Sequence, residues 1–137
     1  MLANNPSPAN WLLPDYILSH LNTPFAWGKH DCVLFAANWV RLATGADPLA
    51  GIEPWSNAMQ AAAAIKQAGG LVAAMDKRFA RINPHSAQDG DLALFASRIP
   101  HPASCICIFS GAHIIGPGDH GSVRNSRMLA EAAWRIK

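Results

Sequence analysis

Hydrophobic residues recur at two different spacings, and the change between them divides the chain into two halves. In the first half they recur every three or four residues, as on one face of a helix. This spacing predicts helices over residues 11–21, 32–45 and 56–70, and a further short helix over 71–79. We expect Pro14 near the start of the first helix, where proline is tolerated, and Ser56 as the N-cap of the third. The second helix is apolar on nearly all sides, which indicates that it is buried.

The second half begins after a turn-rich segment, residues 81–91, and consists of short runs of β-forming residues. Strands are expected over 91–97, 104–110 and 112–116, with weaker candidates at 122–126 and 132–136. A tight hairpin is expected near Gly111. Helices followed by antiparallel strands predict one α+β domain spanning residues 1–137, in which 1–80 are mainly helical and 91–137 mainly β.

Composition and charge argue against several classes of protein. The chain has 137 residues, of which 50% are hydrophobic and 15% charged, as expected of a domain with a packed core. The net charge is only +2 and no run of Lys and Arg adds to it, so we expect no nucleic-acid partner. No apolar stretch reaches the roughly 18 residues of a membrane-spanning helix, so we expect no membrane insertion. The N-terminal residues lack the pattern of a signal peptide, which favours the cytoplasm of the producing cell.

The segment FAWGKHDCVLFAANWV, residues 25–40, places a cysteine where the buried helix should begin. Asp31 suits the N-cap, which puts Cys32 at the first helical position. The helix dipole and the free N–H groups there stabilise a thiolate, the form of cysteine that attacks carbonyl carbons. Trp27 and Gly28 would offer a substrate an aromatic wall and a close approach. The alternative is that Cys32 is a small hydrophobic residue of the core.

Three segments in order along the chain, PFAWGKHDC, GDLALF and CICIFSG, resemble the NlpC/P60 superfamily of papain-like cysteine peptidases. Together with the terminal AAWRIK, they more closely resemble a small family of NlpC/P60-like proteins of phages and prophages, usually encoded among tail genes. The resemblance runs from about Pro24 onward and implies a helix bearing Cys32 packed on an antiparallel sheet. It makes Cys32 the nucleophile, preceded by Asp31, and gives Asp91 a structural role.

The chain departs from the family pattern at the position of the catalytic histidine. When the strand is aligned on its final glycine, Gly111, the histidine position falls on Cys105. A hairpin that turns there would place Cys105 opposite Gly116. His101 has the same strand parity as Cys105 but lies four residues away across Pro102, and it is the candidate base.

The other histidines are weaker candidates for the base. We expect His113 near the hairpin turn and His120 beyond the site, with His30 in the loop before the helix and His20 and His85 facing solvent.

The three cysteines leave two further alternatives open. Cys32, Cys105 and Cys107 could bind zinc together with a histidine, but their spacing fits no standard zinc motif, and we expect no cofactor or metal. Cys32 and Cys105 could instead face each other across the site as an oxidisable pair. An odd number of cysteines does not indicate a disulfide framework.

Two functions from different classes follow from the resemblance. In the first, Cys32 attacks an amide in a peptidoglycan stem peptide, assisted by a non-standard histidine, as the phage opens the cell wall. In the second, the protein is a pseudoenzyme that binds tail hub or baseplate proteins as a structural part of the tail tip. Both place it first in the cytoplasm of the producing bacterium and then in the virion tail.

Overall fold

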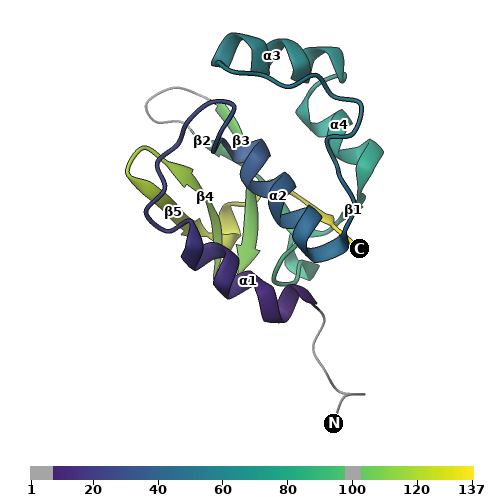
Figure 1. Ribbon diagram of the computed structural model, residues 1–137. Helices are drawn as coiled ribbons and strands as arrows, with labels where there is room; N and C mark the ends of the chain where they lie inside the picture. Colours follow the sequence, from purple (N-terminus) through teal and green to yellow (C-terminus); the bar gives the residue numbers. More distant parts are fainter. Residues whose placement is uncertain (1–7, 98–102) are drawn as a thin grey trace.

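The computed structural model describes residues 8–97 and 103–137. These residues form four α-helices and a six-stranded antiparallel sheet, which confirms the α+β class (Figure 1). The helices are α1 (Pro8–Ser19), α2 (Cys32–Thr44), α3 (Ala58–Gln67) and α4 (Leu71–Arg78). The strands are β1 (Ala80–Ile82), β2 (Leu92–Ser97), β3 (Ala103–Ser110), β4 (His113–Gly118), β5 (Gly121–Ser126) and β6 (Ala132–Arg135), and two 3-10 turns are η2 (Pro84–Ser86) and η3 (Arg127–Leu129).

The strands follow the order β1-β6-β2-β3-β4-β5 across the sheet. Helix α2 crosses one face of the sheet with α1 beside it, and α3 and α4 form a separate arm next to α2 (Figure 1). The larger apolar core lies between these helices and the sheet and includes the fully buried Trp39 and Trp134. A smaller cluster around Phe109 covers the opposite face. No helix in the described ranges has both the length and the apolar character needed to cross a bilayer.

The helix boundaries differ from the prediction at two N-termini. Helix α1 begins at Pro8, so Pro14 lies inside the helix, where it cannot donate to the carbonyl four residues earlier. Helix α3 is capped by Asn57 and not by Ser56, because the Asn57 side chain reaches the Gln60 amide at 2.9 Å. Helix α2 ends as predicted, with Gly45 in the left-handed conformation at φ 78°.

The hairpin between β3 and β4 turns at Gly111 (φ 58°), as predicted, but its register differs from the expectation. Ser110 pairs with His113, so the loop contains only two residues. This register brings Gly116 opposite Cys107, and a Cβ on Gly116 would lie 3.2 Å from the Cys107 sulfur. The expected pairing of Cys105 with Gly116 was therefore wrong by two positions.

In the described part of the chain, the pairing of β3 with β4 ends at Ile108 and Ile115. Beyond this pair and the facing residues Cys107 and Gly116, the register would join Ile106 to Pro117, and proline has no N–H to donate to the neighbouring strand. The far end of β4 instead turns to the loop before α2, where Gly118 accepts a hydrogen bond from the Phe25 amide at 2.8 Å. The two strands thus diverge at the end of β3 that carries Cys105.

Candidate cysteine site

The carboxylate of Asp31 anchors the start of α2 to two loops. It is almost fully buried, with 1% of its surface exposed. One oxygen accepts the Leu34 amide at 2.9 Å as the helix N-cap. The other accepts the Gly28 amide at 3.0 Å and the indole N–H of Trp55 at 2.7 Å. These three bonds hold Cys32 at the first position of the helix, as the sequence predicted.

The two residues expected to face a substrate have different surroundings. Gly28 has φ 77°, and a side chain there would collide with the backbone carbonyl of Trp55. The close approach at Gly28 is therefore to the chain's own loop. Trp27 is 43% exposed and packs edge-to-face on Phe25, with ring centroids 4.8 Å apart, so its indole remains available at the surface.

Cys32 and Cys105 face each other, as one of the sequence alternatives proposed. Their thiols hydrogen-bond, and the backbone amide of Ile106 also donates to the Cys32 sulfur. Both cysteines are half-buried, whereas Cys107, on the same face of β3 as Cys105, is buried beside Phe109. The divergence of β4 from β3 leaves this end of the strand open for the tip of α2.

The thiol pair changes the expected ionisation of Cys32. The hydrogen bond from Cys32 lowers the pKa of Cys105 to about 7. The same bond, followed by burial, raises the pKa of Cys32, although the Ile106 amide acts in the opposite direction. Burial raises the pKa of Cys107 to about 12. The hydrogen bond thus favours the ionised form of Cys105 and disfavours that of Cys32.

Two histidines are packed together next to the site without bonding to Cys32. His30 is 7% exposed and stacks on His20, with ring centroids 5.0 Å apart. Burial, then the neighbouring His20, lowers the pKa of His30. The prediction that His20 faces solvent was wrong, because its ring also packs on Tyr16 and Phe35.

Three of the remaining histidines are exposed at the surface. His85, His113 and His120 are exposed, and His113 lies at the hairpin turn as expected. His101, the candidate base, falls outside the described residues. Among the described histidines, no hydrogen bond to Cys32 is found.

Two further expectations concern Asp91 and metal binding. Asp91 is buried at the start of β2, where it accepts the Gln88 amide at 2.9 Å and faces the Arg135 guanidinium at 3.5 Å. These contacts are those of a structural residue. Within residues 8–97 and 103–137, no cluster of three or more His, Cys, Asp or Glu side chains could hold a metal ion, so the zinc alternative has no support there.

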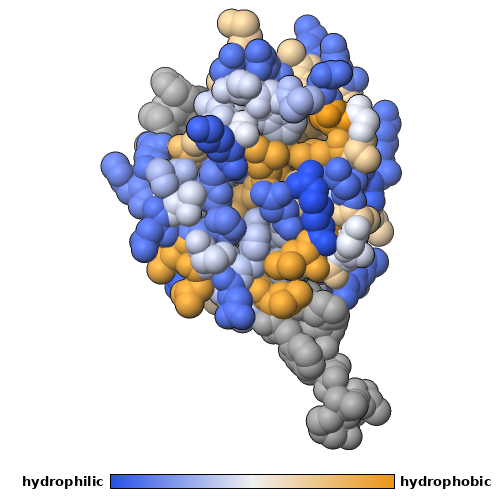
Figure 2. All heavy atoms as spheres, viewed as in Figure 1, coloured by the Kyte–Doolittle hydropathy of each residue, from blue (hydrophilic) through white to orange (hydrophobic). Residues whose placement is uncertain are grey.

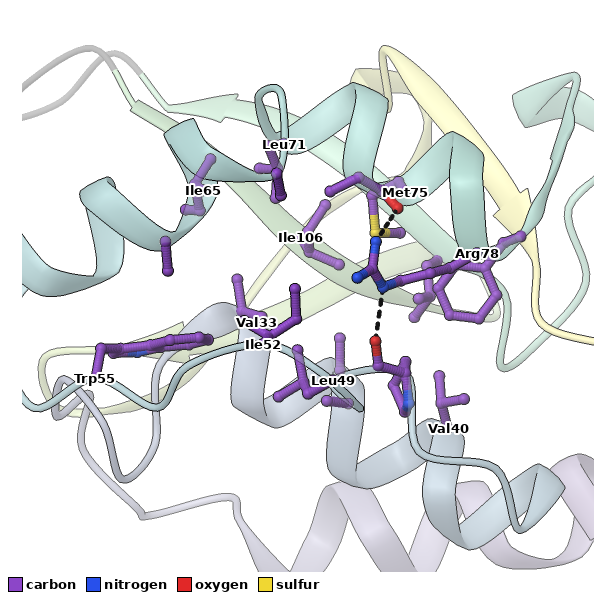
Figure 3. Close-up of a pocket in the computed structure, with 18 residues that line it drawn as sticks. Val33, Val40, Leu49, Ile52, Trp55, Ile65, Leu71, Met75, Arg78 and Ile106 are labelled. Atoms are coloured by element: carbon purple, nitrogen blue, oxygen red, sulfur yellow. Dashed lines mark hydrogen bonds between the residues drawn. The ribbon is translucent and has the colours of Figure 1, made fainter.

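An apolar pocket that the sequence did not predict lies behind the cysteine site. It encloses a cavity of about 70 Å³ between α2, the arm of α3 and α4, and the loop before α3 (Figure 3). Val33 and Ile106, the next residues after Cys32 and Cys105, line it. The Arg78 side chain spans one end and donates to the Pro48 carbonyl at 2.7 Å. Figure 2 shows hydrophobic side chains gathered in a hollow on this face.

A family model described as "Domain of unknown function (DUF6950)" matches residues 9–136. The chain belongs to this family. The DUF6950 match includes Cys32, Cys105 and the helix and strand that carry them. No curated protein matches the chain.

Proposed function

We propose that this DUF6950 domain is an NlpC/P60-like protein of a phage or prophage tail that acts as a structural tail-tip or baseplate component and not as a peptidase. The observation that carries the proposal is the contact between Cys32 and Cys105, since a cysteine peptidase requires an imidazole at this point.

The direction in which the pKa of Cys32 moves is the physical reason. An imidazolium beside a nucleophilic cysteine is positive and lowers the pKa of the thiol. The pKa of Cys32 is raised instead, first by its hydrogen bond with Cys105, then by burial, and less by the charges of Cys105 and Cys107. Cys32 then remains protonated at neutral pH, and Cys105 has too low a pKa to accept its proton efficiently. Among the described residues, no imidazole is bonded to Cys32 to give a proton to the leaving amine of a peptide.

The tail location is supported by the resemblance of the segments around Cys32, Asp91 and Cys105 to tail-encoded NlpC/P60-like proteins. The observed packing of α2 on an antiparallel sheet is compatible with that fold. Adjacent residues Met128 and Leu129 on η3 are 72% and 52% exposed, and a pair of exposed apolar side chains suits contact with a hub or baseplate protein.

The proposal is tested in a phage or prophage that encodes the protein. We expect the protein in purified particles and normal infectivity for the Cys32→Ala variant. Met128→Glu with Leu129→Glu should reduce incorporation, whereas Met59→Glu, at a residue on α3 that is 83% exposed, should not. Absence of the protein from particles, or loss of infectivity in Cys32→Ala with normal assembly, would overturn the proposal.

A second candidate function is a cysteine peptidase acting on peptidoglycan stem peptides. It is favoured by the position of Cys32 at the N-terminus of α2, where the Ile106 amide bonds to its sulfur. His101 would be its base. Cleavage of purified peptidoglycan fragments that is lost in both Cys32→Ala and His101→Ala would establish this function. A lack of cleavage by the unmodified protein would exclude it for that substrate.

A further inference from the structure

A second, wider cavity adjoins the apolar pocket behind the cysteine site. This outer cavity has a volume of about 520 Å³ and lies between the end of α2, residues 46–50 and the end of α4. Exposed residues such as Ala46 and Lys77 line it, so it is open to solvent. The apolar pocket and the outer cavity meet at the residues that line both, which are Val40, Pro48, Arg78 and Phe79.

Arg78 stands at the boundary between the apolar pocket and the outer cavity. Its Nε donates to the Pro48 carbonyl at 2.7 Å and its Nη1 to the Ala74 carbonyl at 2.9 Å (Figure 3). These bonds fix the guanidinium plane and, among the described residues, leave Nη2 without a partner. A fixed guanidinium with an unused N–H group is preorganised to bind an anion.

The charges around the outer cavity also favour an anion. Lys77 and Arg78 occupy the last turn of α4, and neither forms an ion pair in the part of the chain that the structure describes. Asp47, which also lines the cavity, is already paired with Arg41 at 2.8 Å. The C-terminal end of a helix carries a partial negative charge, so an anion could bind there only with the help of these two cations.

The apolar pocket limits the size of the group that accompanies the anion. A cavity of about 150 Å³ holds benzene, so one of about 70 Å³ takes a group of roughly three or four carbons. The side chains of valine and leucine have this size, whereas an aromatic ring or a long acyl chain is too large. Because Arg78 borders the pocket, the anion and the aliphatic group must be close together in the ligand. A C-terminal valine or leucine carries both on one Cα atom.

We propose that the apolar pocket and the outer cavity together bind the C-terminus of a partner polypeptide that ends in valine, leucine or isoleucine. The terminal side chain enters the apolar pocket, and the terminal carboxylate binds Arg78 and Lys77. The preceding residues occupy the outer cavity, whose volume lies within the range of roughly 300–1,000 Å³ that is typical of ligand sites. A free short-chain acid would leave most of the outer cavity unfilled.

The inference goes beyond the proposed function and does not depend on it. The peptide site lies at the ends of α2 and α4, whereas the proposed tail contact is made by Met128 and Leu129 on η3. Peptide binding is measured on the isolated chain, and its failure would leave assembly in the tail unaffected.

The test measures the affinity of the purified full chain for short fluorescent peptides that differ only in their last residue. Peptides ending in valine, leucine or isoleucine should bind, and those ending in glycine or alanine should bind at least about tenfold more weakly. Peptides ending in phenylalanine or tryptophan should not enter the pocket. Amidation of the C-terminus of the best peptide should weaken binding at least about tenfold, because charge-assisted hydrogen bonds are lost.

Variants of the protein separate the two parts of the site. Arg78→Met and Lys77→Met keep a long aliphatic side chain, and each should weaken binding of the free carboxylate form and not of the amidated form. Ala64→Leu, on the wall of the apolar pocket, should weaken binding by filling the pocket. Lys29→Met removes the same charge from an exposed residue outside both cavities, and this control should bind as the unmodified protein does.

The results that would overturn the proposal can be read on the unmodified protein, so they do not depend on a variant that fails to fold. Equal affinity for the free and amidated forms of the best peptide would refute it. It would be refuted equally if no peptide bound, or if a free short-chain acid or a long-chain fatty acid bound more tightly than the best peptide.

Discussion

Replacing Asp31 with alanine should remove three hydrogen bonds that hold the cysteine site together. Loss of the N-cap costs about 1 kcal/mol, and a buried indole N–H left without an acceptor costs about 1–3 kcal/mol. The half-buried Gly28 amide adds about 1 kcal/mol. Relief from burying a carboxylate offsets part of this sum. We expect a net loss of about 3 kcal/mol, which is a large part of the roughly 5–15 kcal/mol that stabilises a typical domain.

Urea denaturation followed by tryptophan fluorescence measures this loss. With a slope of about 2 kcal/mol per molar urea, the midpoint should fall by about 1.5 M. Asn57→Ala is the matched control, because Asn57 caps α3 with a single exposed hydrogen bond to Gln60. It should cost only about 1 kcal/mol. A double-mutant cycle of Asp31→Ala with Trp55→Phe should show coupling of at least about 1 kcal/mol.

The reasoning fails if Asp31→Ala destabilises the protein no more than Asn57→Ala does. It also fails if the effects of Asp31→Ala and Trp55→Phe are simply additive, because the carboxylate would then not depend on the indole.

Three further outcomes are expected. In a pH series with iodoacetamide, the alkylation rate of Cys105 should rise with pH through a midpoint near 7. Cys32→Ala should move this midpoint upward, because the thiol that stabilises the Cys105 thiolate is lost. An unchanged midpoint would contradict the pairing. Gly28→Ala should lower the urea midpoint of unfolding far more than Gly45→Ala does. Both glycines have φ near 78°, but only Gly28 is crowded by a neighbouring loop. Equal losses of unfolding free energy, each about 1 kcal/mol, would argue against that contact. Arg78→Ala should open one end of the apolar pocket and so increase the binding of a hydrophobic fluorescent dye relative to the unmodified protein. Unchanged dye binding would show that the Arg78 side chain does not close that end of the pocket.

The parts of the molecule that follow from local chemistry could be predicted from sequence. The apolar pattern and Gly45 define α2, and Asp31 followed by Cys32 defines its start. The α+β class follows from the order of the two halves. Strand β1 was missed because it has only three residues, which overlap the start of the turn-rich segment and show no alternation. Placement in the NlpC/P60 superfamily stays a prediction.

Contacts between distant segments could not be predicted in the same way. Trp55 donates to Asp31 from a loop with no periodic pattern, so the sequence did not predict this bond. The register of β3 and β4 depends on a two-residue loop, and one residue more or less changes every partner. His20 and His30 stack because a helix end and a loop meet, which no local spacing encodes.

Because β3 and β4 diverge near Pro117, the backbone amide of Ile106 can report on the state of the cysteine site. The Ile106 amide donates to a sulfur at the point where pairing with β4 has ended. Its NMR chemical shift and hydrogen-exchange rate therefore depend on the chemical state of Cys32, whereas the amides of Ile108 and Phe109 remain in regular strand contacts. A single backbone resonance can thus report whether Cys32 is a free thiol, alkylated or joined to Cys105.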